Sequence, residues 1–189
     1  MINLPTRIID VSISLFVLAI FFPIMIIISI IIIIIDGRPV FYKQARVGYM
    51  GRQFFIFKYR TMKNVALKDE QLRLTSFGKI LRKTSLDELP QFINVLRKDM
   101  SIVGPRPLPA SIEKKIKRSI KLKRRKILPG ITGMSQINYK GRNRKLNEKL
   151  KLDLIFIDNY TLYNYFKVLL KTPSVLVVRF FKNKSSIIK

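Results

Sequence analysis

Two adjacent carboxylates, Asp87 and Glu88, lie among cations in the segment RKTSLDELPQ. The 189-residue chain holds 37 Lys and Arg against 11 Asp and Glu, and it contains neither His nor Cys. This composition excludes the commonest general base, thiolate metal sites and disulfides. Acid–base, nucleophilic or metal chemistry must therefore use carboxylates, supported by Lys, Arg, Tyr, Ser or Thr. The acidic pair beside Arg82 and Lys83 is the first candidate.

The same segment also has a purely structural interpretation. Ser85 followed three residues later by Glu88 matches a capping box, in which each side chain accepts from a backbone N–H group. Asp87 would then complement the positive end of the helix dipole. A helix N-terminus also holds phosphate well, so capping and chemistry are compatible.

The formal net charge of +26 points to polyanionic partners, which are nucleic acid, an anionic membrane surface or phosphorylated small molecules. No helix-turn-helix, zinc or aromatic RNA-binding signature accompanies the charge, so we expect no nucleic-acid partner. The length suits one modest domain.

An uncharged apolar run of about 25 residues, Val11–Ile35, is long enough to cross a membrane. One spanning helix is the simplest interpretation. However, Pro23 lies near the middle and leaves two arms of about 18 Å each, which reach only the bilayer midplane. Basic residues also flank both ends, which favours a helix that enters and returns to the cytoplasmic side. The residues alone leave both geometries open.

The remaining chain predicts both strands and helices. Val40–Gln44 and Gln53–Tyr59 are predicted to form a hairpin, and the 74–97 region has helical spacing broken by Gly78 and Pro90. VGPRPLP predicts an extended loop. LPGITGMSQIN predicts a loop whose N–H groups can meet phosphate.

Two further helices are predicted nearer the C-terminus. Ile112–Ile127 predicts one basic amphipathic helix, which either lies in a membrane interface or packs on the core by its Ile stripe. Lys149–Lys182 has a helical pattern, and its segment Val175–Phe181 is apolar enough to touch the bilayer.

A family resemblance rests on several motifs in order. RLTSFGKILRKTSLDELPQFINVLRKDMSIVGPRPL closely resembles the catalytic region of bacterial sugar transferases, the small monotopic phosphoglycosyl transferases. The resemblance covers nearly the whole chain, and its other segments are RIID, PVFYKQARVG, FFIFKYRTM, PGITG, QIN and GRN. Three positions depart from the usual pattern, namely Phe22 before the helix proline, Leu128 and Met134.

The resemblance implies an α+β, mostly helical fold. An N-terminal re-entrant membrane helix, residues 1–36, would break at Pro23. Residues 37–189 would form a catalytic domain with a small β-hairpin and amphipathic interfacial helices. Its active site would lie at the cytoplasmic face of the bacterial inner membrane.

The resemblance also implies a reaction in two steps. Asp87 would attack the β-phosphorus of a UDP-sugar and release UMP, and undecaprenyl phosphate would then take the phosphosugar from the aspartate. Mg²⁺ suits a site with carboxylates only, and Asp87 and Glu88 would hold it. The resemblance assigns phosphate binding to Lys58 and Arg82, and nucleotide binding to Arg106 and Asp153.

Two alternatives belong to other classes. A membrane-anchored basic adaptor, which binds anionic lipid or nucleic acid without catalysis, explains the charge and the apolar run but not the ordered motifs. An ordinary nucleotide-sugar glycosyltransferase is disfavoured because the chain has no D-x-D motif. Neither the sugar, the glycan pathway nor the oligomeric state follows from the sequence.

Overall fold

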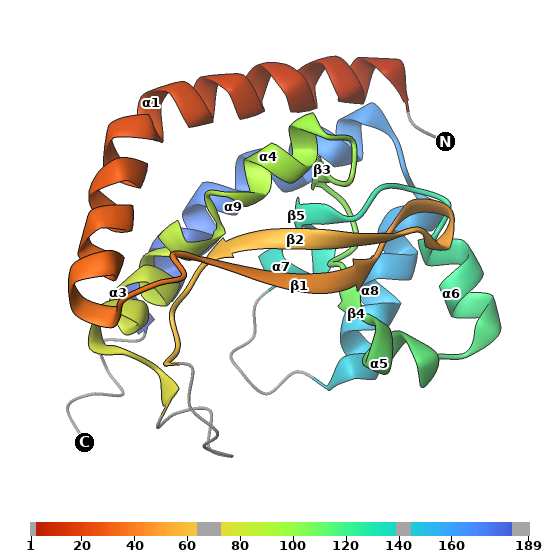
Figure 1. The fold of residues 1–189 in the computed structure, drawn as a ribbon. Coiled ribbons are helices and arrows are strands. Elements are labelled where there is room, and N and C mark those ends of the chain that lie inside the picture. Colours follow the sequence, from red (N-terminus) through yellow and green to blue (C-terminus); the bar gives the residue numbers. More distant parts are fainter. Residues whose placement is uncertain (1–2, 64–72, 139–144, 183–189) are drawn as a thin grey trace.

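The computed structural model describes residues 3–63, 73–138 and 145–182, and it has a mostly helical α+β fold with small sheets (Figure 1). The GRN motif at 141–143 lies outside the described residues. The described α-helices are α1 (Leu4–Asp36), α3 (Ser76–Thr84), α4 (Gln91–Leu96), α5 (Ala110–Lys114), α6 (Arg118–Arg124), α7 (Met134–Ile137), α8 (Leu146–Asp158) and α9 (Leu162–Lys182).

The long apolar helix α1 has 33 residues and ends at Gly37, whose positive φ of 72° suits a residue without a side chain. Pro23 lies inside the helix, where it cannot donate the usual backbone hydrogen bond. Figure 1 shows the ribbon of α1 running along the top of the molecule and then turning down one side. By length and composition alone, α1 can cross a membrane. Its re-entrant geometry stays a prediction.

The first arm of α1 is anchored to the rest of the protein by polar side chains. The guanidinium of Arg7 is buried and donates to the carbonyl oxygens of Val95 at 2.6 Å and Leu96 at 3.0 Å. Arg7 was one of the basic residues flanking the apolar run, and in the fold it caps carbonyls at the end of α4. The predicted division at residues 36 and 37 stays a prediction, and these contacts cross it.

The predicted hairpin is confirmed and is longer than expected. Strands β1 (Phe41–Val47) and β2 (Gln53–Tyr59) pair antiparallel around a 3-10 turn, η1 (Tyr49–Gly51). A short strand, β4 (Leu108–Pro109), adds to the other edge of β1. The extended loop predicted from VGPRPLP therefore contains an edge strand.

A second, parallel sheet of two strands was not predicted. It pairs β3 (Ser101–Val103) with β5 (Gly130–Thr132), inside the segment expected to be a loop. The strands meet closely because Gly104 and Gly130 lack side chains, and a Cβ at Gly130 would overlap the backbone of Gly104. The N–H group of Gly130 donates to the carbonyl oxygen of Pro105, so it does not face phosphate.

Two hydrophobic clusters hold these elements together. The larger lies between β3, α8 and α9 and contains Val95, Met100, Phe156, Tyr165 and Val168 among its buried members. The smaller joins the second arm of α1 to β2 and α3 through Ile28, Ile32, Tyr59 and Leu81. Leu86, in the segment after α3, packs against this cluster, so the segment that carries Asp87 lies against the apolar helix.

Two predicted helix boundaries were wrong. Gly78 does not break its helix but lies inside α3, where its missing side chain makes room for the carbonyl of Thr61. The expected basic helix Ile112–Ile127 is two short helices, α5 and α6, separated at 115–117 where Ile116 turns into the core. The helical pattern predicted over Lys149–Lys182 is confirmed, and it comprises α8 and α9, because the chain turns between Asp158 and Leu162.

Candidate active site

The acidic pair lies in a single 3-10 turn, η2 (Leu86–Glu88), between α3 and α4. Ser85 ends α3 in the left-handed conformation, with φ of 60°, and so reverses the chain direction. Pro90 then starts α4, where a missing N–H group costs little. The turn buries Asp87, which is 7% exposed, and leaves Glu88 beside it half-buried.

The predicted capping box is wrong. Ser85 precedes η2, but its side chain makes no capping hydrogen bond there. The N-terminus of α3 is instead capped by Thr75, whose Oγ1 accepts from the N–H of Gly78 at 2.9 Å. Glu88 does not turn back to Ser85, because its carboxylate is engaged by two cations.

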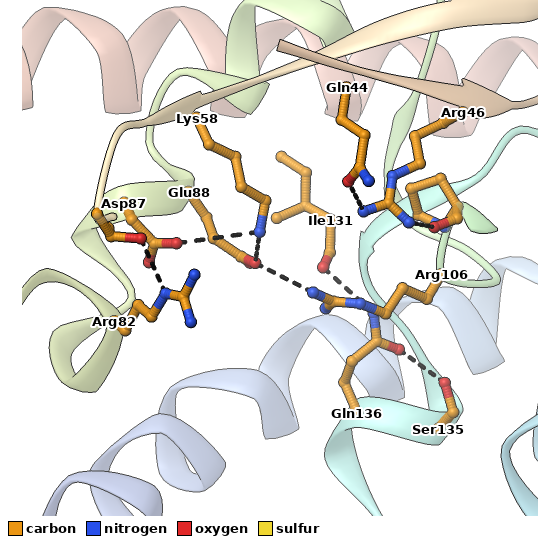
Figure 2. A network of polar contacts seen from close by, with 12 residues as sticks. Gln44, Arg46, Lys58, Arg82, Asp87, Glu88, Arg106, Ile131, Ser135 and Gln136 are labelled. Atoms are coloured by element: carbon orange, nitrogen blue, oxygen red, sulfur yellow. Dashed lines mark hydrogen bonds and ion pairs between the residues drawn. The ribbon is translucent and has the colours of Figure 1, made fainter. Parts of the chain in front are cut away.

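Those cations come from distant parts of the chain. Lys58, on β2, forms an ion pair with Oε1 of Glu88, and its Nζ lies 4.0 Å from Oδ2 of Asp87. Arg106, in the loop before β4, places Nη2 3.3 Å from the same Glu88 oxygen. Arg82, at the end of α3, donates from Nε to Oγ1 of Thr61 at 2.9 Å. Figure 2 shows these side chains converging on the acidic pair.

The two carboxylates differ in their affinity for protons. Burial and the negative charge of Glu88 raise the pKa of Asp87 to about 6, against the opposing charges of Lys58, Arg82 and Arg106. Burial alone would also raise the pKa of Glu88, but Arg106 and Lys58 outweigh it and lower that pKa to about 2. Glu88 is therefore ionised at neutral pH, whereas the ionised form of Asp87 is less stabilised by its surroundings.

Asp153 lies one layer away from this cluster. It is 3% exposed, and its carboxylate forms an ion pair with Arg124. The other end of that guanidinium donates to the backbone carbonyl of Arg106 at 2.6 Å. Asp153 therefore meets the acidic pair only through Arg124 and the backbone of Arg106, and its predicted nucleotide contact stays a prediction.

Two residues near the site were not singled out from the sequence as site residues. Gln44 and Arg46 lie on β1, and they face the same space as Lys58 and Arg106 in Figure 2. Cross-strand pairing of Tyr42 with Lys58 sets this register, so side chains two and four residues further along β1 share that face. The two-residue alternation along β1 would place Gln44 and Arg46 on one face, but only the pairing of β1 with β2 shows that this is the face of Lys58.

The predicted metal would have few protein ligands at this site. Among the described residues, no group of three or more carboxylate, His or Cys side chains gathers as a metal cluster. Mg²⁺ commonly uses only one or two protein carboxylates and completes its shell with water and substrate phosphates. The adjacent Asp87 and Glu88 satisfy that smaller requirement, and Glu88 is ionised at neutral pH.

The family pattern of bacterial sugar transferases matches residues 2–179 of the chain. This chain belongs to the bacterial sugar transferase family. A Bacillus subtilis member, named uncharacterized sugar transferase EpsL, is 42% identical over 154 residues, which cover 75% of this chain and 72% of that protein. The sequence resemblance is thereby confirmed.

Other members carry names that state a reaction. A UDP-glucose:undecaprenyl-phosphate glucose-1-phosphate transferase of Caulobacter vibrioides is 33% identical over 189 residues, covering 93% of this chain and 71% of that protein. A Klebsiella pneumoniae protein of the same name is 34% identical over 193 residues. The match covers 95% of this chain but only 41% of the Klebsiella protein, so the chain spans less than half of that relative.

Proposed function

We propose that this protein transfers a sugar-1-phosphate from a UDP-sugar to undecaprenyl phosphate, with Asp87 as the nucleophile. The reaction names of its relatives support the substrate classes. The observation that carries the proposal is that Asp87 is a buried carboxylate with a raised pKa, which faces several cations and forms no ion pair closer than 4.0 Å with another described residue.

In the first step, a carboxylate oxygen of Asp87 attacks the β-phosphorus of the UDP-sugar. The new bond joins that oxygen to phosphorus, and the bond from phosphorus to the bridging oxygen breaks. The bridging oxygen leaves with its electron pair as part of UMP. A phosphosugar remains on the aspartate as a mixed anhydride, a linkage that resembles other aspartyl phosphates.

In the second step, a phosphate oxygen of undecaprenyl phosphate attacks the same phosphorus. The bond between phosphorus and Asp87 breaks, and the carboxylate is regenerated. The product is a polyprenyl-diphosphate sugar, and no net proton is gained or lost. Splitting one displacement into two lets the same cations stabilise both transition states.

The surrounding residues have separate tasks in this scheme. Lys58 lies between Asp87 and Glu88, so it can neutralise the transferred phosphate as the nucleophile approaches. Arg82, fixed by Thr61, adds positive charge on the α3 side. Glu88 holds Lys58 and Arg106 in place before substrate arrives.

Mg²⁺, when bound to Asp87 or Glu88 and to substrate phosphates, would neutralise charge on the diphosphate and polarise its oxygens. Lys58 and Arg106 both contact Oε1 of Glu88, so metal binding at this oxygen and substrate binding should be coupled. We expect chelation by EDTA to remove activity and excess Mg²⁺ to restore it.

The proposed location of the site is the cytoplasmic face of the bacterial inner membrane, with α1 entering and leaving on the same side. Support comes from exposed apolar side chains on the second arm of α1, including Ile27, Ile30 and Ile34. The end of α9 also exposes Val177 and Phe181, and α9 contacts α3. The lipid carrier would then reach Asp87 along this apolar side.

The test is UMP release from a panel of UDP-sugars by purified protein in nanodiscs with Mg²⁺. Wild type is compared with Asp87→Asn and with Asp158→Asn, whose exposed carboxylate pairs with Lys123 at the surface. We expect release by wild type and Asp158→Asn but not by Asp87→Asn. Without lipid carrier, release should stop near one UMP per protein, and mass spectrometry should find the phosphosugar on Asp87.

Other outcomes would redirect the assignment. Release that needs lipid carrier from the first turnover, with no protein adduct, would exclude the covalent intermediate but keep the transferase. Folded protein that binds anionic vesicles and releases no UMP from any donor would favour the basic membrane adaptor. The net charge of +26 and the exposed apolar surface are the observations behind that alternative.

A further inference from the structure

One cation at the far end of the polar network, Arg46, has no task in the reaction described above. Arg46 is half-buried on β1, where its Nη1 donates to the carbonyl oxygen of Pro107 at 3.2 Å and its Nη2 donates to Oε1 of Gln44. Its Nε–H group is buried and has no hydrogen-bond partner within the described part of the chain. A guanidinium held by two neutral acceptors, with a donor unused, is an incompletely satisfied cation.

The positive charge of Arg46 is also not fully balanced by negative charge nearby. Burial and the positive charge of Arg106 lower the pKa of Arg46, while Glu88 opposes this only in part. Oε1 of Glu88 already binds Lys58 and Arg106. In residues 3–63, 73–138 and 145–182, no carboxylate oxygen is within ion-pair distance of Arg46. A partly buried cation of this kind is stabilised when a ligand brings an anion.

The position of Arg46 indicates which anion this is. Strand β1 begins beside α1, where Phe41 stacks on Tyr59 and the hydroxyl of Tyr59 donates to Met25 of α1. Arg46 lies at the other end of the strand, paired with β4 at Pro109. Figure 2 places Asp87 and Arg82 at one end of the network and Gln44 and Arg46 at the other. Arg46 is therefore at the end of the strand remote from the second arm of α1, which holds Met25, Ile28 and Ile32.

We propose that Arg46, held by Gln44 and by the carbonyl of Pro107, binds the α-phosphate of the nucleotide, which leaves as part of UMP. This inference rests on the proposed function. Lys58 and Arg82 would then serve the transferred phosphate at Asp87, and Arg46 would serve the departing one. A planar guanidinium fork suits two phosphate oxygens, and the hydrogen bond to Gln44 orients that fork.

The experiment separates the phosphate from the nucleoside by measuring the affinities of UMP and of uridine in nanodiscs. Variants are Arg46→Gln, Arg46→Lys and Arg52→Gln, a matched control that removes an exposed cation from the turn of the same hairpin. In Arg46→Gln we expect UMP to bind about tenfold more weakly or worse, with uridine unchanged. Arg46→Lys should recover part of the loss, and Arg52→Gln should match wild type.

Two results would overturn the inference. Equal losses for UMP and uridine, together with a lower melting temperature, would make Arg46 a structural support for the Pro107 loop. An unchanged ratio of UMP to uridine affinity, together with a raised KM for undecaprenyl phosphate, would assign Arg46 to the acceptor phosphate. Failure of the proposed function is separate, because it would appear as absent UMP release by wild type while the binding ratio is still measured.

Discussion

Asp10 and Asp87 are both nearly buried aspartates, and they have opposite surroundings. Asp10, on α1, accepts hydrogen bonds at one carboxylate oxygen from the hydroxyl of Ser101, the N–H of Ile102 and the hydroxyl of Tyr165. These donors are 2.7–3.1 Å away. Asp87 has Lys58 at 4.0 Å, beyond hydrogen-bonding distance, and its neighbour Glu88 takes the close ion pairs.

This difference separates a structural carboxylate from a reactive one. The negative charge of Asp10 is used to join α1 to β3 and α9, so a ligand at that oxygen would have to displace existing donors. Asp87 keeps its charge near cations, and no donor from the described part of the chain is hydrogen-bonded to it, as a nucleophile requires. Burial alone does not distinguish the two residues, and the number of close donors does.

The largest expected effect is the loss of activity when Asp87 is replaced. Asp87→Asn should lower UMP release by about a thousandfold or more, because the amide cannot form the acyl-phosphate linkage. The variant should melt at or above the wild-type temperature, since it removes a buried charge without close donors. The measurements are single-turnover kinetics and thermal unfolding. A variant that retains most of its activity would end the distinction between the two aspartates.

Replacing Asp10 should lower the stability of the fold instead of the activity. Asp10→Ala would leave the donors of Ser101, Ile102 and Tyr165 unsatisfied in the interior, at a cost of about 3 kcal/mol or more. Denaturant unfolding in detergent micelles measures this cost, with Asp158→Ala as a surface control expected to lose at most about 1 kcal/mol. An Asp10→Ala protein of unchanged stability would show that the cluster does not anchor α1.

The pH dependence should follow Asp87. Its pKa is raised from 3.8 to about 6, so its contribution to stability is full below pH 3.8 and is lost as the pH rises through 6. Activity changes the other way, because only the carboxylate attacks. We expect kcat/KM to fall about tenfold per pH unit below about 6, while Glu88, with a pKa of about 2, stays ionised. A flat profile from pH 5 to 7 would contradict the raised pKa of Asp87.

The smallest expected effect concerns the hydroxyl group of Tyr165, which donates to Asp10. Tyr165→Phe removes one donor at 2.7 Å and keeps the packing of the ring, so we expect a loss of about 1 kcal/mol in unfolding free energy. UMP release per folded molecule should be unchanged. Denaturant titration and the same kinetic assay test both points. A large loss of activity without a loss of stability would connect this cluster to the reaction.

Local patterns in the sequence predicted part of the molecule correctly. The alternation and turn residues around Gln53–Tyr59 gave the hairpin, because a strand pair closed by a short turn depends mainly on neighbouring residues. The ordered motifs gave the family. The adjacent acids and the nearby cations gave a candidate site, and Lys58 and Arg106 do reach Glu88.

The errors arose where distant residues decide the outcome. The capping box failed because Glu88 binds Lys58 and Arg106, which are about 30 and 18 positions away. As cations, they attract its carboxylate more strongly than a local N–H group does. Gly78 was read as a helix breaker, yet the carbonyl of Thr61 approaches α3 at that point. Ile116 divided a predicted helix because the core accepted its side chain.

The sequence by itself determined which chemistry is available, since a chain without His or Cys must rely on its 11 acids, supported by Lys, Arg, Tyr, Ser or Thr, in any nucleophilic or acid–base role. It also determined the long apolar helix, because an uncharged run of this length is typical of a helix that enters a membrane. Only the tertiary structure decided which buried aspartate has donors fixed on it and which does not. That decision depends on pairings between residues far apart in the chain, because hydrogen bonds and charge–charge energies depend on distance in space rather than on order in sequence.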